Sequence, residues 1–313
     1  MRAYIRLFRP INLVLVALTQ YLVLFYIIRP IFLLSHYDLA MTRLDFALFV
    51  IAHLMLAAAG YAINDYYDTD IDATNKPEKN MLISRIPRKM GYNINMGLNV
   101  VACLIGFYCA YKVGNIKLGF LPVVVALALF YYSLKYKRQF LTGNFAIALI
   151  IAYAILVVWL FQFFAIKADA LVFVAGIGTY KSITMFVCGM AIFAFLITFI
   201  REMVKDMEDV EGDRANGCNT APVKLGLKKT RNLLMWISIF AMALLATAQY
   251  FLFDDYPTTA YYLLVLQIMF VYFLVRLLRA EKKSDYHALS IFLKIMMVAG
   301  LLATQMLSVN FLP

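Results

Sequence analysis

Oxygen-bearing side chains recur at helical spacing in the stretch "INDYYDTDIDATNKPEKN", which spans residues 63–80. Asn64, Asp68 and Asp72 are each four residues apart, so on a helix they would share one face. Three oxygen ligands would then point in the same direction, directly behind the apolar run "FVIAHLMLAAAGYA".

A second acidic stretch, "REMVKDMEDVEGDRANG", repeats this arrangement with Asp206, Asp209 and Asp213 at spacings of three and four residues. Carboxylates stacked in this way repel one another unless a cation lies between them. Mg²⁺ prefers oxygen ligands, binds one or two carboxylates, and fills its other positions with water and phosphate oxygens. The predicted metal ligands are Asn64, Asp68, Asp72, Asp206, Asp209 and Asp213.

Two other interpretations of these carboxylates fit the residue types. Acidic residues at the ends of membrane helices can simply be solvated, but here the same-face spacing occurs twice in a chain with only 18 Asp and Glu. Asp68, Asp70 and Asp72 also match the opening of a calcium-binding loop, yet Ala73 and Lys79 occupy its glycine and glutamate positions. The spacing therefore favours a magnesium diphosphate site.

Basic and aromatic residues accompany the two acidic stretches. Cations near a metal-bound diphosphate would neutralise its remaining charge and favour its departure as a leaving group. The predicted diphosphate-binding residues are Lys137, Arg138, Lys135 and Lys76, although ordinary membrane anchoring explains such residues equally well. Aromatic rings can stabilise a nearby carbocation, and the candidates are Tyr61, Tyr131 and Tyr132.

The elements that position these residues are predicted to be membrane-spanning helices. The chain is 64% hydrophobic and only 15% charged, with a mean hydropathy of +0.79, which excludes a soluble domain. Nine apolar segments are near the length that crosses a bilayer. They are Ile11 to Leu34, Asp45 to Ile63, Ile94 to Tyr111, Leu118 to Leu134, Asn144 to Ile166, Ser182 to Ile200, Leu233 to Phe253, Thr258 to Leu278, and Leu289 to Val309.

The distribution of charge predicts the orientation of the chain. Most of the 29 Lys and Arg lie in alternate loops, which places the N-terminus and both acidic stretches on the cytoplasmic side. The net charge of +11 therefore needs no nucleic acid to explain it. The short loops leave no room for a separate soluble domain, so we expect one membrane domain over residues 1–313. The two acidic stretches, four spans apart, suggest a repeat of spans one to four and five to eight, plus a ninth.

The sequence resembles the UbiA superfamily of intramembrane prenyltransferases over essentially the whole chain. The family motif N-D-x-x-D-x-x-x-D reads here as Asn64, Asp65, Asp68 and Asp72, and D-x-x-D-x-x-x-D reads as Asp206, Asp209 and Asp213. Supporting matches are "RPIN" at residues 9–12, "YSLKYKR" at 132–138 followed by "GN" at 143–144, and "NTAPVKLG" at 219–226. One departure is Lys76, where many relatives have arginine.

The resemblance implies an all-helical bundle with a central cavity open to lipid and a cytoplasmic cap. It also implies Mg²⁺-dependent transfer of a prenyl group from a polyprenyl diphosphate to a lipophilic acceptor, with Asp68, Asp72, Asp209 and Asp213 as catalytic carboxylates. The motif stretches look most like the branch that transfers geranylgeranyl to geranylgeranylglyceryl phosphate. The alternative is an aromatic quinone precursor, dihydroxynaphthoate or hydroxybenzoate.

A cation-coupled transporter is the competing interpretation from another class. Such proteins place ionisable groups near the bilayer midplane on broken helices. In this sequence the carboxylates cluster at the ends of the predicted spans, which disfavours transport.

Overall fold

The computed structural model describes residues 2–33, 39–75, 80–251 and 256–309, and all regular secondary structure in this part of the chain is helical. Nine helical segments of the described chain are long and apolar enough to cross a membrane, as predicted. They are Pro10–Leu33, Arg43–Tyr67, Arg88–Lys112, Ile116–Leu134, Thr142–Lys167, Ile177–Glu208, Leu227–Tyr250, Tyr256–Arg279 and Lys283–Met306.

Several spans are built from more than one helix. The first consists of α2 (Pro10–Leu22), the π-helical turn η1 (Val23–Ile28) and α3 (Arg29–Leu33). The eighth likewise contains α15 (Tyr256–Tyr261), the π-helical turn η4 (Tyr262–Gln267) and α16 (Ile268–Arg279). The other spans are formed by α4 (Arg43–Tyr67), α7 (Arg88–Lys112), η2 (Ile116–Gly119) with α8 (Phe120–Leu134), α9 (Thr142–Lys167), α11 (Ile177–Glu208), α14 (Leu227–Phe251) and α17 (Lys283–Val309).

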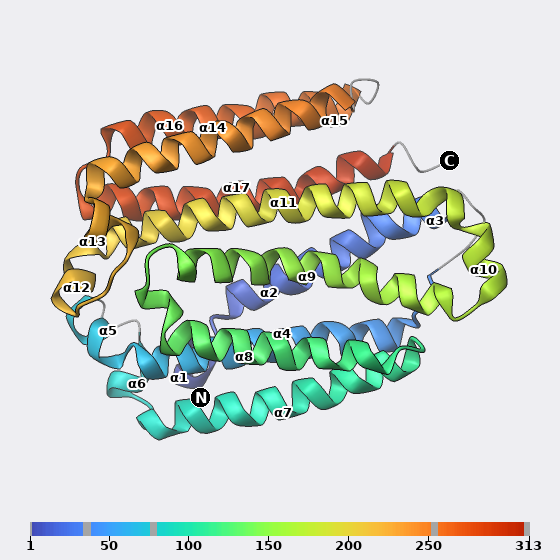
Figure 1. Cartoon of the computed structure of the whole chain (residues 1–313), viewed down its shortest axis with the longest axis horizontal. Coiled ribbons are helices and arrows are strands. Elements are labelled where there is room, and N and C mark those ends of the chain that lie inside the picture. The colour runs from blue at the N-terminus through green and yellow to red at the C-terminus, as the bar shows by residue number, and fades with distance from the viewer. Residues whose placement is uncertain (1, 34–38, 76–79, 252–255, 310–313) are drawn as a thin grey trace.

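The spans run along the long axis of an elongated bundle (Figure 1). Helix α4 packs against α7 and α8, while α11 packs against α9, α17 and α14. Short helices gather at one end of the bundle, and these are α5 (Thr69–Asn75), α6 (Met81–Ser84), α12 (Val210–Ala215) and α13 (Ala221–Leu225). The remaining short helices are α1 (Arg2–Leu7), η3 (Tyr136–Arg138) and α10 (Ala170–Ala175).

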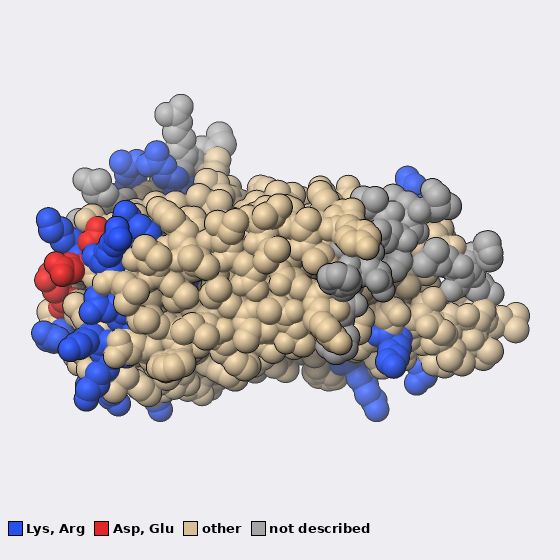
Figure 2. Space-filling view, turned by 90° about the horizontal axis from the view of Figure 1, so that it is seen from above, with Lys and Arg blue, Asp and Glu red and all other residues tan. Residues whose placement is uncertain are grey.

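The outer surface has the character expected of a lipid-facing protein. Large apolar side chains are strongly exposed in the middle of spans, such as Leu104 at 66%, Trp236 at 70% and Leu264 at 63%. Charged residues lie at the two ends with an uncharged band between them (Figure 2), and acidic atoms are visible on this face at the end that carries α5 and α12. Such helices can face lipid because each one satisfies its backbone hydrogen bonds internally.

Both acidic motifs bend at their middle aspartate. Helix α4 ends at Tyr67 and α5 begins at Thr69, with Asp68 between them at φ −90° and ψ 0°. The N–H of Asp68 still donates to Asn64 O at 2.9 Å, and that of Asp72 to Asp68 O at 2.7 Å. These two bonds cross the bend, while the carbonyl oxygens of residues 65–67 accept hydrogen bonds from the side chains of Asn80, Arg88 and Arg138.

The second motif has the same geometry. Helix α11 ends at Glu208, Asp209 adopts φ −100° and ψ 8°, and α12 begins at Val210. The N–H of Asp209 donates to Lys205 O and that of Asp213 to Asp209 O, at 2.9 and 3.0 Å. We expected each motif to lie on one continuous helix. Each motif instead spans two helices that meet at its middle aspartate.

A tight loop connects α8 to α9 and carries the predicted diphosphate ligands. A Cβ atom on Gly143 would lie 2.8 Å from the Cα of Lys137 and 2.9 Å from the carbonyl oxygen of Tyr136. Only glycine allows η3 to pack this closely on the first turn of α9. Leu141, which precedes α9, adopts a positive φ of 54°, a conformation that is uncommon outside glycine.

Candidate active site

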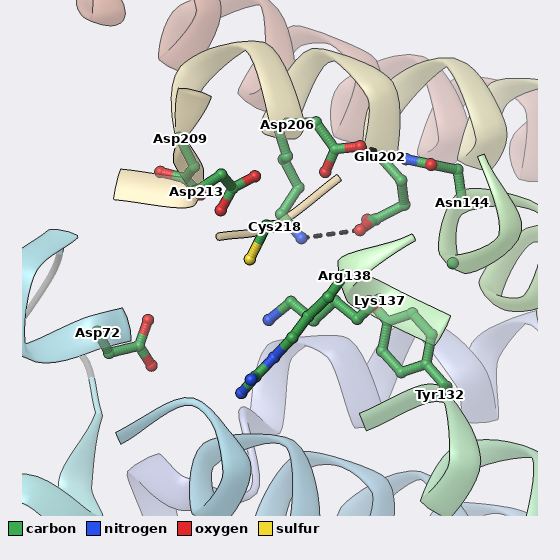
Figure 3. Close-up of a pocket in the computed structure, with 12 residues that line it drawn as sticks. Asp72, Tyr132, Lys137, Arg138, Asn144, Glu202, Asp206, Asp209, Asp213 and Cys218 are labelled. Carbon is green, nitrogen blue, oxygen red and sulfur yellow. Dashed lines mark hydrogen bonds and ion pairs between the residues drawn. The ribbon is translucent and has the colours of Figure 1, made fainter. Parts of the chain in front are cut away.

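A polar pocket lies at the bundle end where the two bent motifs meet the loop between α8 and α9. It holds about 650 Å³ of open space, its mouth included. Its walls are Asp72, Tyr132, Lys137, Arg138, Gly143, Asn144, Glu202, Lys205, Asp206, Asp209, Asp213 and Cys218. Asp72 stands on one side of the pocket and the second motif on the other, with Lys137 and Arg138 extending between them (Figure 3).

All three aspartates of the second motif line the pocket. The amide nitrogen of Asn144 donates to Asp206 Oδ2 at 2.8 Å, and the hydroxyl of Thr220 donates to Asp213 Oδ2 at 3.1 Å. Burial raises the pKa of Asp213 to about 6, the Thr220 hydrogen bond opposes this, and the neighbouring Asp209 charge adds to it. Crowded carboxylates of this kind attract a cation.

Of the first motif, Asp72 lines the pocket, and Asn64 and Asp68 contact Lys137, another lining residue. Asp72 lines the pocket and accepts a hydrogen bond of 2.9 Å from Asn80 Nδ2. Burial raises the pKa of Asp72, and the charge of Asp68 raises it further. Asn80 also donates to Asp65 O at 2.8 Å, which ties the segment after α5 to the end of α4.

Asp68 and Asn64 already hold a cationic group, the ammonium of Lys137. Lys137 Nζ forms an ion pair with Asp68 Oδ2 and lies 3.4 Å from Asn64 Oδ1. Asn64 Nδ2 donates to the same Asp68 oxygen at 2.7 Å. Burial alone would lower the pKa of Lys137, but the facing Asp68 carboxylate raises it above its usual value. The ammonium therefore stays charged between these oxygens.

Arg138 lines the pocket and has one buried donor without a partner among the described residues. Its Nη2 donates to Tyr67 O at 3.1 Å. Its Nε is buried and has no hydrogen-bond partner among the described residues. The carbonyl oxygen of Arg138 accepts from Asn219 N at 2.8 Å, which fixes η3 to the segment after α12. A buried donor in this state is ready for an anionic acceptor.

Asp65, the remaining acidic member of the first motif, does not line the pocket. Its Oδ1 accepts from Arg9 Nη2 at 2.6 Å, and the carboxylate is only 2% exposed. The Arg9 guanidinium also lies 4.8 Å from the ring centre of Tyr61. Arg9 adopts a positive φ of 49° immediately before α2. The "RPIN" match thus joins the start of the first span to the end of the second.

Of the predicted tyrosines and the two remaining lysines, some lie at the pocket and others do not. Tyr132 lines the pocket, and Tyr61 lies under Arg9 outside the pocket lining. Tyr131 is 49% exposed and contacts Phe130 and Tyr136, so it is not brought into the pocket. Lys135 is exposed and does not line the pocket either. Lys76 lies outside the described residues.

Five residues that line the pocket were not among the predicted site residues, and these are Gly143, Asn144, Glu202, Lys205 and Cys218. Glu202 accepts from Lys205 Nζ at 2.9 Å and from Arg201 Nη1 at 2.6 Å. A signal for Glu202 existed, since it precedes Asp206 by four residues and shares its helical face. Asn144 follows Gly143 in the "GN" match, but its contact with Asp206 depends on how α9 packs on α11.

The carboxylate and amide oxygens at the pocket suit a hard divalent cation as ligands. No group of three Asp, Glu, His or Cys side chains is close enough to hold a metal ion within the described residues. Mg²⁺ needs no such cage, because one or two carboxylates suffice when water and phosphate complete its octahedron. The oxygens of Asn64 and Asp68 gather round the Lys137 ammonium, which shows that this part of the site already accepts a positive charge.

Comparisons with known proteins agree with this geometry. The sequence model of the UbiA prenyltransferase family matches residues 14–298. A digeranylgeranylglyceryl phosphate synthase from Methanothermobacter thermautotrophicus is 30% identical over 97% of this chain and 95% of its own.

Two solved structures share the fold. One, described as giving structural and mechanistic insights into digeranylgeranylglyceryl phosphate synthase in membranes, is 26% identical with a TM-score of 0.66, covering 99% of this chain and 98% of its own. Another, a UbiA homologue from Archaeoglobus fulgidus bound to GPP and Mg²⁺, has a TM-score of 0.59 at 16% identity. It covers 96% of this chain and 99% of its own.

Proposed function

The chain belongs to the UbiA prenyltransferase family and is a multi-pass membrane prenyltransferase, and we propose that it transfers a geranylgeranyl group to geranylgeranylglyceryl phosphate. The name of the similar synthase denotes a glyceryl phosphate that carries two geranylgeranyl groups. Adding a second group to a singly prenylated glyceryl phosphate gives that product. The donor in our proposal is geranylgeranyl diphosphate.

The observation that carries the proposal is the convergence of both aspartate motifs on one pocket beside Lys137 and Arg138. Asn64, Asp68 and Asp72 on one side, and Asp206, Asp209 and Asp213 on the other, would hold Mg²⁺. When bound, Mg²⁺ would neutralise the diphosphate and stabilise it as a leaving group. Arg138 Nε, which lacks a partner among the described residues, would donate to a phosphate oxygen, and Lys137 would supply a second cation.

The reaction breaks the allylic C–O bond of the donor, and the diphosphate leaves with the bonding electrons. The glycerol hydroxyl of the acceptor forms a new C–O bond to the same carbon, and its proton passes to the released diphosphate or to water. Tyr132 lines the pocket, where its ring face can stabilise positive charge on the allyl group. The apolar bundle keeps the prenyl chains out of water while the diphosphate stays at the charged end.

We also propose that this charged end faces the cytoplasm. The loops at the pocket end carry most of the Lys and Arg, as the positive-inside rule requires of cytoplasmic loops. Accessibility labelling of a cysteine placed at Asp70, which is exposed near the pocket, would test the orientation in intact cells.

The acceptor is tested by an assay of the full chain in nanodiscs with radiolabelled geranylgeranyl diphosphate. Geranylgeranylglyceryl phosphate and dihydroxynaphthoate are offered in parallel, each with Mg²⁺ or with EDTA. We expect Mg²⁺-dependent product from the glyceryl phosphate alone. Product from dihydroxynaphthoate alone would assign the chain to the quinone branch of the family and contradict the proposed acceptor.

A further inference from the structure

A second cationic cluster lies beside the pocket, where α2, α4, α11 and α17 come together. Lys294 of α17 donates from Nζ to Asn12 Oδ1 of α2 at 3.3 Å. Arg9, Arg201 and Lys205 are close enough to act on Lys294 electrostatically. Of these cations, Lys205 also lines the pocket that holds the aspartate motifs. The cluster is therefore adjacent to the diphosphate site and distinct from Lys137 and Arg138.

The acidic partners of this cluster do not balance its cations. Asp65 pairs with Arg9, and Glu202 is shared by Arg201 and Lys205. Lys294 forms no ion pair with any described residue. Arg201 Nε is buried and makes no hydrogen bond within the described part of the chain. A partly buried positive charge and a buried N–H without an acceptor both cost free energy unless an anion pairs with them.

An apolar groove continues from this cluster into the membrane. It holds about 410 Å³ of open space between α2, α9, α11 and α17. Among its lining residues, Thr19 lies seven residues beyond Asn12, and Met297 and Leu301 lie three and seven residues beyond Lys294. Ile197 precedes Arg201 by one helical turn.

These spacings place the cations and the groove on the same faces of the same helices. The chain directions put the cations at the charged end and the groove roughly 10 Å deeper, given a rise of about 1.5 Å per residue. The ammonium of Lys294 therefore lies at the polar end of the apolar groove. This arrangement fits an amphiphile with one anionic end.

We propose that Arg201 and Lys294, supported by Arg9 and Lys205, bind the phosphate monoester of the prenylated glycerol acceptor while its chain lies in the apolar groove. This inference rests on the proposed function for the acceptor's identity. A phosphate monoester carries about −1.5 to −2 charges near neutral pH, which matches the excess of cations over Asp65 and Glu202. A phosphate-free acceptor would leave that excess uncompensated.

The direct test is lipid binding measured by thermal stabilisation of the full chain in detergent. Geranylgeranylglyceryl phosphate, its phosphate-free analogue geranylgeranylglycerol, and inorganic phosphate are compared. We expect the phosphorylated lipid to bind wild type at least about tenfold more tightly than the neutral analogue, since charged hydrogen bonds contribute this much. Inorganic phosphate, which has no chain for the groove, should require far higher concentrations.

Lys294→Met removes the charge and keeps an apolar side chain of similar length. It should weaken binding of the phosphorylated lipid about tenfold and leave binding of the neutral analogue unchanged. Lys294→Arg should retain most of the preference, and Lys283→Met, an exposed change at the start of the same helix, serves as the matched control. Mg²⁺-dependent binding of geranylgeranyl diphosphate reports whether each variant is folded. If Lys294→Met does not fold, Arg201→Gln takes its place as the test variant.

Several outcomes would overturn the inference. If wild type binds the two lipids equally tightly, the inference is wrong, whether or not the enzyme turns over the phosphorylated lipid. It is also wrong if inorganic phosphate stabilises the protein as much as the phosphorylated lipid does at the same concentration. Equal losses for both lipids in Lys294→Met would show that the residue packs against the chain and does not bind phosphate. Selective binding of the phosphorylated lipid without turnover would contradict the proposed function alone.

Discussion

Lys137 shows how one side chain can serve the site before any substrate binds. Its ammonium pairs with Asp68, a carboxylate that is 2% exposed, and lies against Asn64. A buried carboxylate without a partner is costly, so Lys137 stabilises the ligand-free site. The same cation lies beside the space in which we place the diphosphate.

Replacing Lys137 with Met should therefore weaken the binding of geranylgeranyl diphosphate in Mg²⁺. Loss of one charged hydrogen bond costs about 1.5–3 kcal/mol, or roughly 10- to 100-fold in affinity. Lys135→Met, two residues away on an exposed side chain, should change the affinity less than about twofold. Titration calorimetry on both variants checks this, and equal losses would mean that the loop contributes only general positive charge.

Asp213 gives the ligand-free protein a predictable response to pH. Burial raises its pKa to about 6 in the folded state, above the ordinary value of 3.8. The folded protein then holds a proton that the unfolded chain has lost, so Asp213 stabilises the fold most at low pH and loses this effect as pH rises through about 6. In EDTA, melting temperatures of Asp213→Asn should depend less steeply on pH between about 4 and 6 than those of wild type. Parallel curves would contradict this assignment.

At the residue scale, the sequence predicted what local spacing controls. The second motif, Asp72, Lys137 and Arg138 all line the pocket, because helical periodicity and a short loop determine their direction. The pairings of Arg9 with Asp65 and of Asn144 with Asp206 could not be predicted, since they join residues 56 and 62 positions apart. Tyr131 and Lys135 share the sequence context of Tyr132 and Lys137 but lie exposed, Tyr131 within α8 and Lys135 directly after α8 ends at Leu134.

At the scale of elements, the two bent motifs have equivalent geometry. Asp68 and Asp209 both occupy the bridge region between helices, and each keeps its hydrogen bonds four residues back and forward. This likeness supports the proposed repeat of spans one to four and five to eight, which stays a prediction. Periodicity alone could not reveal the bends, because a bend at the middle aspartate leaves the spacing of the sequence unchanged.

The contact between Gly143 and η3 sets the position of the diphosphate loop. Gly143→Ala would press a methyl group against the backbone of Lys137, 2.8 Å away, and overpacking of this kind costs about 1–3 kcal/mol. We expect weaker donor binding together with a lower melting temperature. Gly189→Ala in α11, where a Cβ meets nothing within 4 Å, is the control and should leave both unchanged or slightly raise stability. Unimpaired binding in Gly143→Ala would show that the loop can shift without cost.

At the scale of the whole molecule, hydropathy predicted the nine spans of the described chain and the all-helical class. The ends of the spans were less predictable. The third span begins at Arg88, before its apolar run. The sixth continues past its apolar run to Glu208 and so carries Asp206 of the second motif. The order in which the helices pack depends on contacts between distant segments, such as α11 against α9 and α17, that no local pattern encodes.

The central claim is that the two aspartate motifs form a single metal-dependent diphosphate site at one end of the bundle. The most direct measurement is calorimetric titration of geranylgeranyl diphosphate into wild type, Asp72→Asn and Asp209→Asn, each with and without Mg²⁺, with Asp70→Asn as the exposed control from the same stretch. We predict Mg²⁺-dependent binding that is lost in either motif variant and retained in the control. Wild-type binding that is independent of Mg²⁺, or that survives in either motif variant, would contradict the claim.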